Sequence, residues 1–552
     1  MAPLAFRGLF AVRSPLIKRA GRKKFGRPVR AGRQTRRDGL SAYPPVHALM
    51  QSPTVLAGSS LLGTRILAML GLFHGLSLAL QFALSCILVA VCTLSVQLAV
   101  LAWVRVFRKS PILTRPTLTD AELPHVLVQL PVCNEGLLAV RVVEAAARMD
   151  WPLDRLTIQL LDDGDGESHA ALARDAMAVT PEGVTLEILR RGHRTGFKAG
   201  NLAFGLKHCE APYVAIFDAD FVPPPDFLRR TVPVLLGDSG LAFVQARWGH
   251  ANRNANWLTR VQGLLLDSHF AVEQEARFRA GLPISFNGTA GVWSRTAIED
   301  GGGWTGDTLT EDLDLSMRCT MRNWRAAMLP DLLVPGELPQ TAAAWRAQQA
   351  RWTKGHAQVA RKLLPQVWVS RMPLWKKAAM TLQMCQFAFY MMAFASAAIS
   401  LTLMYMGVVY YSAVALLGLI VTLLGLASSI GYLYLGQRML GLQHEPRLYR
   451  ALLLAVVFPS GLILANTRAT FEAFFSTRMD FNRTTRVGET HAGGWRGLPE
   501  LVAGVLLPIF AFAESNWSAV FFFFAVAGLV SIGAMGASGA GEPVRSRITP
   551  GE

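Results

Sequence analysis

The stretch YVAIFDADF, residues 213–221, runs from apolar β-forming residues into two aspartates that are separated by one alanine. An unbroken apolar run of this kind is typical of a strand buried on both faces, as in a parallel sheet. Side chains two residues apart on an extended strand point to the same side, so Asp218 and Asp220 would face one point. Two carboxylates there can hold Mg²⁺ or Mn²⁺, which prefer hard oxygen ligands. Alternatively, they are turn-forming aspartates that precede the loop FVPPPDF.

Two further stretches also run from apolar residues into polar ones: HVLVQLPVCNE (125–135) and LTIQLLDDGDGES (156–168). Helical patterns lie between the predicted strands, at 137–149 and 199–208. Alternating strands and helices predict an α/β domain with a mostly parallel sheet and right-handed crossovers. Ligands of such sheets bind beyond the carboxyl ends of the strands, which is where these acids fall.

The composition predicts that part of the chain lies in lipid. Of the 552 residues, 51% are hydrophobic and only 17% are charged, below the quarter or so that is usual in soluble domains. A helix needs about 20 mostly apolar residues to cross the hydrocarbon. Residues 54–73 could add a second N-terminal span, and 451–467, broken by Pro459 and Gly461, could be interfacial, re-entrant or a short span. The stretches that qualify by length are 76–104, 380–406, 408–435, 498–513 and 517–537.

Basic residues predict the topology. The chain has 55 Lys and Arg against 38 Asp and Glu, a formal net charge of +17. Because Lys and Arg flank the apolar segments, the positive-inside rule places the flanked ends in the cytoplasm. No basic stripe with interleaved aromatic residues is present, so anionic lipid is a better partner than nucleic acid. The six cysteines are scattered without a CxxC pair, which argues against a zinc site or a disulfide framework.

These patterns predict seven regions. They are a basic arm (1–52), an N-terminal transmembrane region (53–107), a cytosolic α/β domain (118–370), amphipathic and transmembrane helices (371–467), a cytosolic loop region (468–497), a C-terminal transmembrane hairpin (498–540) and a tail (541–552).

Four more side chains in the α/β region are candidates for nucleotide binding or catalysis. Asp162 or Asp163 could contact a base or ribose, although a tight Asp-Gly turn explains them equally. Lys198, beside a predicted helix start, suits a diphosphate, although most such lysines are only solvated. In TLTEDLDLSMRC (308–319), Asp312 can act as a general base, although Thr310 as N-cap with acids in the first turn also explains the sequence.

The stretch AWRAQQARWTKG, residues 344–355, predicts a helix that carries Gln348, Arg351 and Trp352 on one face. Arginine can clamp phosphate, and an indole offers a flat surface on which a sugar ring can stack. An amphipathic helix at the membrane surface would also favour Arg and Trp at these positions.

The order of these motifs between membrane segments resembles the family 2 glycosyltransferases, the membrane group of cellulose, chitin, hyaluronan and mannan synthases. The motifs are DD, FDADF, TED and QQARW. The phrases VQARWGHAN, FNGTAGVW and ELPQTAAAWRAQQARW most resemble the cellulose synthase-like mannan and glucomannan synthases. The likeness is close over roughly 120–370 and looser as far as 488, where FNRTTRVG is similar to the gating loop of these enzymes.

The resemblance implies a nucleotide-diphospho-sugar transferase (GT-A) fold inserted between transmembrane helices. It also implies a role for each matching residue. Asp163 or Asp162 contacts the nucleotide, Asp218 and Asp220 bind the metal, and Lys198 lies near the diphosphate. Asp312 is the catalytic base, with Glu311 beside it in the binding site. Gln348, Arg351 and Trp352 hold the acceptor end and the diphosphate, and Phe481, Thr484 and Arg486 belong to the gating loop.

The implied reaction is inverting transfer from GDP-mannose or UDP-glucose, with Mg²⁺ or Mn²⁺, to a growing β-linked polysaccharide. The aromatic residues Trp103, Tyr390, Tyr405 and Tyr410 could line the exit route of the chain through the bilayer, although core packing or interfacial anchoring explains them equally well. The implied location is a plasma (inner) membrane in a bacterium or a Golgi membrane in a plant or alga, with accessory secretion proteins as further partners. Two alternatives are a single-transfer enzyme that makes a glycolipid and a non-catalytic membrane protein with a degenerate transferase domain.

Overall fold

The computed structural model describes residues 53–164, 166–408, 412–475, 499–505 and 526–531. The chain divides after Leu72 into two units. The first unit contributes only the beginning of helix α2 (Pro53–Phe107) to the described residues, and all strands lie in the second.

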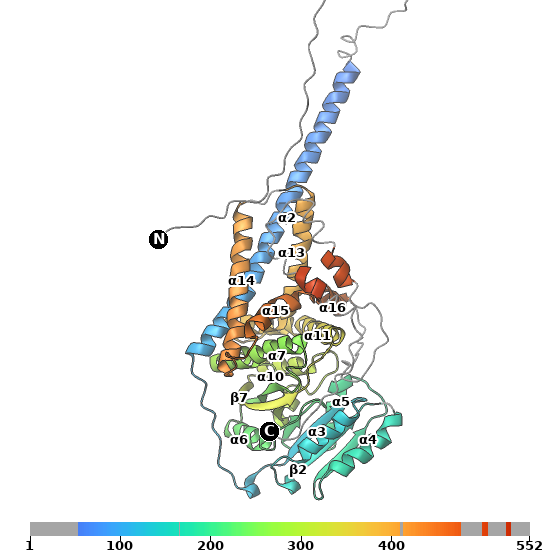
Figure 1. The fold of residues 1–552 in the computed structure, drawn as a ribbon, viewed down its shortest axis with the longest axis vertical. Coiled ribbons are helices and arrows are strands. Elements are labelled where there is room, and N and C mark those ends of the chain that lie inside the picture. The colour runs from blue at the N-terminus through green and yellow to red at the C-terminus, as the bar shows by residue number, and fades with distance from the viewer. Residues whose placement is uncertain (1–52, 165, 409–411, 476–498, 506–525, 532–552) are drawn as a thin grey trace, which may run out of the picture. The chain divides into compact units, whose positions relative to one another are not determined.

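The second unit contains a seven-stranded sheet in the order β3-β2-β1-β4-β6-β5-β7. In Figure 1 the sheet lies below the long helices α13 (Ala388–Tyr405) and α14 (Ser412–Met439). Neighbouring strands are parallel except at β6, which runs antiparallel to both β4 and β5. The expectation of an α/β fold with a mostly parallel sheet is therefore confirmed. The strands are β1 (Val126–Val132), β2 (Leu156–Asp162), β3 (Thr185–Arg190), β4 (Tyr213–Ile216), β5 (Leu241–His250), β6 (Gly291–Ser294) and β7 (Arg325–Gly336).

The predicted strands β1 and β2 are buried along their whole length, as their unbroken apolar runs require. Val132 pairs with Asp162 in the register of these two strands, so their carboxyl ends are level. Strand β4 pairs with β1 only from Tyr213 to Ile216. The chain therefore leaves β4 on the side of the sheet where β1 and β2 end.

The predicted helices at 137–149 and 199–208 correspond to α3 (Leu137–Ala147) and α5 (Phe197–Leu206). A π-helical segment, η3 (His269–Gln274), joins α7 to α8, and such segments often occur at functional sites. The other helices of this domain are η1 (Asp120–Glu122), η2 (Leu153–Arg155), α4 (Gly166–Val179), α6 (Phe227–Gly237), α7 (Trp257–Ser268), α8 (Glu275–Ala280), α9 (Arg295–Asp300), α10 (Glu311–Met321) and α11 (Ala342–Val369).

Three helical stretches of the described chain are long and apolar enough to cross a membrane: Leu67–Phe107, Leu374–Tyr405 and Ala413–Met439. They correspond to the predicted spans 76–104, 380–406 and 408–435. The second stretch consists of α12 (Leu374–Met384), η4 (Cys385–Phe387) and α13 (Ala388–Tyr405), and the third lies in α14 (Ser412–Met439).

A fourth apolar segment is bent. Helices α15 (Leu448–Ser460) and α16 (Ile463–Phe475) meet at 45°, and together they pass the same test of length and composition. The bend falls at the predicted break, because proline removes a helix hydrogen bond and glycine weakens the helix. The predicted additional span at 54–73 lies within α2, in which the candidate span that passes the test of length and composition begins at Leu67. Of the predicted pair at 498–513 and 517–537, only 499–505 and 526–531 are described.

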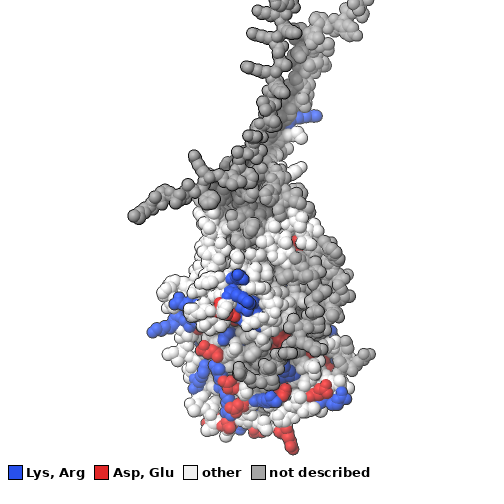
Figure 2. Space-filling model, viewed as in Figure 1, with Lys and Arg blue, Asp and Glu red and all other residues white. Residues whose placement is uncertain are grey.

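The long helices expose large apolar side chains. Leu72, Phe82 and Leu416 are 75%, 73% and 57% exposed, and Lys, Arg, Asp and Glu gather instead over the sheet domain on the face shown in Figure 2. Extensive apolar surface of this kind is suited to contact with lipid.

Helix α14 packs closely on α7 of the sheet domain. A Cβ atom at Gly436 would lie 2.8 Å from Ser268 Cα, and the Ser268 hydroxyl donates a hydrogen bond to Leu433 O over 3.3 Å. Beside this contact, Arg253 donates to both Asp267 and Gln437. A long apolar helix and the sheet domain are thus joined through buried polar contacts.

Candidate active site

A cavity of about 580 Å³ lies at the carboxyl ends of the central strands. Its walls come from the chain after β1, β2 and β4, from the starts of α5 and α10, from α11, and from η4 and α13. The structure describes ten of the predicted site residues, and nine of them border this cavity although their motifs are far apart in the sequence: Asp163, Lys198, Asp218, Asp220, Glu311, Asp312, Gln348, Arg351 and Trp352.

The two aspartates after β2 have different surroundings. Asp163 borders the cavity and accepts hydrogen bonds from Arg191 Nε at 2.7 Å and Nη2 at 2.5 Å. Asp162 is buried below the rim, where it accepts from Gly164 N at 2.7 Å and pairs with His169 Nδ1 at 2.6 Å. Its position does not support contact with a ligand, because Asp162 does not border the cavity. Asp163 remains the candidate of the pair.

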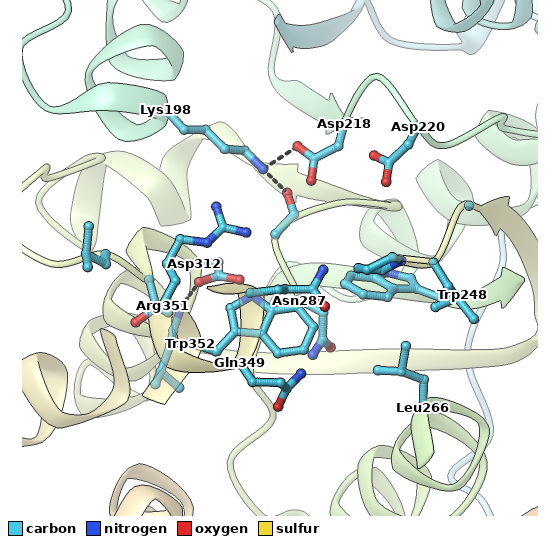
Figure 3. Close-up of a pocket in the computed structure, with 18 of the residues that line it drawn as sticks. Lys198, Asp218, Asp220, Trp248, Leu266, Asn287, Asp312, Gln349, Arg351 and Trp352 are labelled. Carbon is cyan, nitrogen blue, oxygen red and sulfur yellow. Dashed lines mark hydrogen bonds and ion pairs between the residues drawn. The ribbon is translucent and has the colours of Figure 1, made fainter. Parts of the chain in front are cut away.

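Asp218 and Asp220 both border the cavity, but they do not lie on an extended strand as the sequence predicts. Strand β4 ends at Ile216, and the aspartates lie in a turn in which Phe221 N donates to Asp218 O over 3.0 Å. The amide of Asp218 donates to Thr289 Oγ1 over 2.9 Å rather than to a neighbouring strand. Both carboxylates nevertheless face the cavity, from the loop and not from an extended strand (Figure 3).

Lys198 is the second residue of α5, directly after Gly196 and Phe197 at the helix start. Its Nζ atom donates to Asp218 Oδ1 at 2.5 Å and to Gly288 O at 2.8 Å (Figure 3), and lies 3.9 Å from Glu311 Oε1. Burial opposes the charged form, but the carboxylates of Asp218 and Glu311 outweigh it and raise the pKa of Lys198. The ammonium group is therefore charged at neutral pH.

Glu311 and Asp312 begin α10 after Thr310, which occupies the predicted N-cap position but makes no side-chain capping bond. Its side chain instead packs on α11, where a Cβ atom at Gly355 would lie 2.7 Å from Thr310 Oγ1. Burial and the neighbouring Glu311 carboxyl raise the pKa of Asp312 to about 7, against the effects of the Leu313 amide and Lys198. Burial also raises the pKa of Glu311, with Lys198 opposing. Asp312 can thus accept a proton near neutral pH.

Helix α11 carries Gln348, Arg351 and Trp352 to the opposite wall of the cavity, as the helical spacing predicts. Thr341 caps this helix by accepting from Ala344 N over 3.2 Å. The three side chains lie on one capped helix, so the Arg351 guanidinium and the Trp352 indole border the cavity from the same element.

Several cavity residues have no role in the sequence prediction, among them Trp248, His269, Glu273, Asn287 and Gln349. Trp248 and Asn287 stand in the phrases VQARWGHAN and FNGTAGVW, which was the available signal. His269 and Glu273 lie in the π-helical segment, whose conformation has no simple sequence pattern.

The structure separates the aromatic residues that were predicted to line an exit route. Tyr390 borders the cavity, whereas Tyr405 is 85% exposed and Trp103 is 61% exposed, and neither borders it. Tyr410 and the gating-loop residues Phe481, Thr484 and Arg486 lie outside the described residues.

The side chains at the rim fit a divalent cation that is shared with a ligand. Asp218 and Asp220 provide carboxylate oxygens on one wall, while the described residues contain no group of three or more His, Cys, Asp and Glu side chains that could hold a metal alone. A cation at this wall would complete its coordination with phosphate oxygens and water, as Mg²⁺ commonly does.

Comparison with known proteins gives consistent matches. Residues 128–296 match the family model described as Glycosyl transferase family 2, and residues 213–428 match Glycosyl transferase family group 2. The chain is 42% identical over 263 residues to glucomannan 4-beta-mannosyltransferase 7 of Arabidopsis thaliana, covering 47% of each chain. It is 42% identical over 267 residues to glucomannan 4-beta-mannosyltransferase 1 of Oryza sativa subsp. japonica, covering 48% of this chain and 51% of the relative. It thus spans about half the length of these relatives.

The fold also matches a solved structure, the mannosyltransferase PcManGT from Pyrobaculum calidifontis in complex with GDP-Man and Mn²⁺. The TM-score is 0.50 at 19% sequence identity, and the match covers 72% of this chain and 100% of the other. A likeness at this identity shows a common GT-A fold and nothing further.

Proposed function

Because the chain carries a glycosyltransferase family 2 domain with a GT-A fold, we propose that it is a membrane-embedded, inverting and processive hexosyltransferase. Its product is a β-linked polysaccharide of the mannan, glucomannan or β-glucan type, made from GDP-mannose or UDP-glucose. The similarity to glucomannan 4-beta-mannosyltransferases supports GDP-mannose as the first donor to test.

The observation that carries the proposal is the position of Asp312. Its carboxyl, with a pKa of about 7, shares one cavity with the Lys198–Asp218 pair and with Arg351. A proton acceptor and groups suited to a diphosphate therefore lie around one volume. Glycosyl transfer requires both a proton acceptor and diphosphate-binding groups around one volume.

In the proposed mechanism, Asp163 contacts the nucleoside, while Lys198 and Arg351 contact the diphosphate. When bound by Asp218 and Asp220, a divalent cation supplies further neutralisation of the charge on the leaving group. Asp312 takes the proton of the acceptor hydroxyl as that oxygen attacks the anomeric carbon. A single displacement inverts the configuration, so an α-linked donor gives a β-linked product.

The cavity supports an elongating enzyme over a single-transfer one. It continues from the carboxylates to Gln386 and Tyr390 of the second apolar stretch and to Pro459 and Leu462 at the bend between α15 and α16. A polymer held in this volume would lie against helices that are apolar enough to enter the membrane. We further propose that the sheet domain faces the cytosol, where nucleotide sugars are made available.

The test uses the full chain in lipid nanodiscs with radiolabelled GDP-mannose or UDP-glucose. We expect a polymer that a linkage-specific mannanase or glucanase degrades, no product from Asp312→Asn, and no product in EDTA until Mn²⁺ or Mg²⁺ is restored. A single labelled glycolipid would show single transfer instead. Turnover of neither donor, by transfer or hydrolysis, would favour a non-catalytic protein.

A further inference from the structure

The wall of the cavity next to Asp312 contains polar side chains that the mechanism above does not use. His269 and Glu273 of η3 border the cavity, and so does Asn287. Asn287 directly precedes Gly288, where a Cβ atom would lie 3.2 Å from Asp312 Oδ2. The backbone next to Asn287 therefore lies beside the base, and all three side chains border the same cavity.

Hydrogen bonds fix which way the Asn287 amide points. Gln274 Nε2 donates to Ser285 O at 2.8 Å and to Asn287 Oδ1 at 2.6 Å. A backbone carbonyl can only accept, so the NH₂ group of Gln274 must face Ser285, and Asn287 must present its oxygen to Gln274. The Nδ2 atom of Asn287 consequently points to His269 Nε2, which is 3.0 Å away.

The opposite end of this chain of hydrogen bonds is a buried carboxylate. Because His269 Nε2 accepts from Asn287, the ring hydrogen lies on Nδ1, which donates to Glu273 Oε2 at 3.1 Å. Glu273 Oε1 accepts from Arg277 Nε and from Gln386 Nε2, both at 3.1 Å. Burial would raise the pKa of Glu273, but Arg277 and His269 hold it well below its usual range. The carboxylate stays ionised and keeps the His269 ring in one tautomer.

One hydrogen of the Asn287 amide is used by His269, and the other has no partner among the residues that the structure describes. The side chain lies in the cavity with Asp312 (Figure 3). We propose that Asn287 binds the terminal sugar of the acceptor, donating this second hydrogen to an oxygen next to the attacking hydroxyl. His269, Glu273 and Gln274 are positioning residues that hold the amide in this orientation. The inference rests on the proposed function and names the acceptor contact within it.

The contact would act on the acceptor and not on the donor. When only the attacking hydroxyl is hydrogen-bonded to Asp312, the sugar ring can still rotate about that bond. A second hydrogen bond to the same ring removes this rotation. Losing one such bond weakens binding by roughly three- to tenfold. Hydrolysis of the donor by water uses the same donor site and base but needs no such contact, so it should continue.

The first measurement is binding, so it does not depend on turnover. Mannohexaose and cellohexaose are titrated into the full chain in nanodiscs, with tryptophan fluorescence as the signal, because Trp248 and Trp352 border the cavity. We expect Asn287→Ala to weaken oligosaccharide binding three- to tenfold and to raise the acceptor KM equally. Donor KM and donor hydrolysis should stay within twofold of the unsubstituted protein.

The second measurement is a double-mutant cycle. His269→Phe cannot accept from Asn287, whereas His269→Gln offers an oxygen that can replace Nε2. We expect His269→Phe to match Asn287→Ala, His269→Gln to recover most of the binding, and the double variant to be no weaker than Asn287→Ala alone. A residue that only stabilises the fold would give additive losses and no recovery by glutamine.

Asn254→Ala is the control, since its amide oxygen accepts from Arg260 Nη2 over 2.7 Å and neither residue borders the cavity. It should leave oligosaccharide affinity unchanged, and thermal unfolding monitors the fold of every variant. Unchanged affinity and acceptor KM in folded Asn287→Ala, or additive effects in the cycle, would overturn the inference. Failure of the unsubstituted protein to use any nucleotide sugar while it still binds the oligosaccharides would refute only the proposed transfer.

Discussion

The carboxyl of Asp312 predicts a pH dependence. Its pKa is raised from 3.8 to about 7, so the ionised form that accepts a proton becomes the main form only above neutral pH. We expect the transfer rate to rise between about pH 6 and pH 8, with a midpoint near 7. The check is a pH profile of kcat at saturating donor, and a rate that is flat over this range would contradict the assignment.

The same pKa has a consequence for stability. A carboxyl whose folded pKa is raised favours the protonated folded state, and this contribution is lost as the pH rises from 3.8 to about 7. The side-chain amide introduced by Asp312→Asn does not titrate. The melting temperature of this variant should therefore improve relative to the unsubstituted protein as the pH increases through this window.

Gly288 should tolerate no side chain. Its φ is +80°, and an added Cβ would lie 3.2 Å from Asp312 Oδ2 and 3.6 Å from Lys198 Nζ. We expect Gly288→Ala to lower the free energy of unfolding by about 1 kcal/mol and the transfer rate by more than tenfold. Gly281→Ala is the matched control, with a φ of +66° and nothing within 4 Å of its Cβ position. Gly281→Ala should lose stability and keep its transfer rate. Equal transfer rates in Gly281→Ala and Gly288→Ala would show that the space beside Asp312 is not needed for transfer.

At the scale of elements, the close packing of α10 on α11 positions the base. A Cβ atom at Gly355 would lie 2.7 Å from Thr310 Oγ1, directly before Glu311 and Asp312. Gly355→Ala should push the start of α10 away, destabilise the protein by roughly 1–3 kcal/mol and lower kcat more than it changes donor KM. Gly431→Ala in α14 meets nothing within 4 Å and should leave both kinetic constants unchanged.

The elements also show how far the sequence could predict this protein. Unbroken apolar runs identify β1, β2 and β4, because these strands are buried on both faces. Helical spacing identifies α5 and α11, because each of these helices is buried on one face. Strand β6 is not evident from the sequence, because its antiparallel place between β4 and β5 depends on pairing with distant segments. For the same reason the end of β4 at Ile216 was missed: the amide of Asp218 finds its partner in Thr289, which is remote in the sequence.

The residues of the candidate site also divide into those that the sequence predicts and those that depend on distant parts of the fold. The places of Asp312 and Arg351 at the cavity were predictable because each stands in a short motif, and the order of the motifs along the chain resembles that of a known family. His269, Glu273 and Asn287 were not, since their arrangement depends on a π-helical segment and on an amide orientation that only the folded hydrogen-bond pattern specifies.

At the scale of the molecule, a buried ionic group joins the sheet domain to α14. Asp267 pairs with Arg253 and lies 3.3 Å from His250, and Gln437 donates to it over 3.2 Å. Burial would raise the pKa of Asp267, but His250 and Arg253 lower it to about 2. The pair therefore persists at all pH values at which the protein would be assayed.

Asp267→Ala would leave the Arg253 guanidinium buried without this carboxylate, at a cost of about 3–5 kcal/mol. We expect a lower melting temperature and faster proteolysis between α7 and α14 in detergent or nanodiscs. Asp331→Ala, at an exposed position on β7, provides the comparison and should behave like the unsubstituted protein. Equal proteolysis of the two variants would show that the junction does not depend on this pair.

The contact of Ser268 with α14 has one more consequence. Ser268 bonds to Leu433, and the next residue, His269, begins the segment that borders the cavity. A helix tilts when its apolar length exceeds the thickness of the surrounding hydrocarbon, and α14 is apolar enough to be immersed there. Such a tilt would be transmitted to the cavity wall through the peptide bond between Ser268 and His269. Acyl-chain length in reconstituted bilayers should therefore change the rate of the proposed sugar transfer.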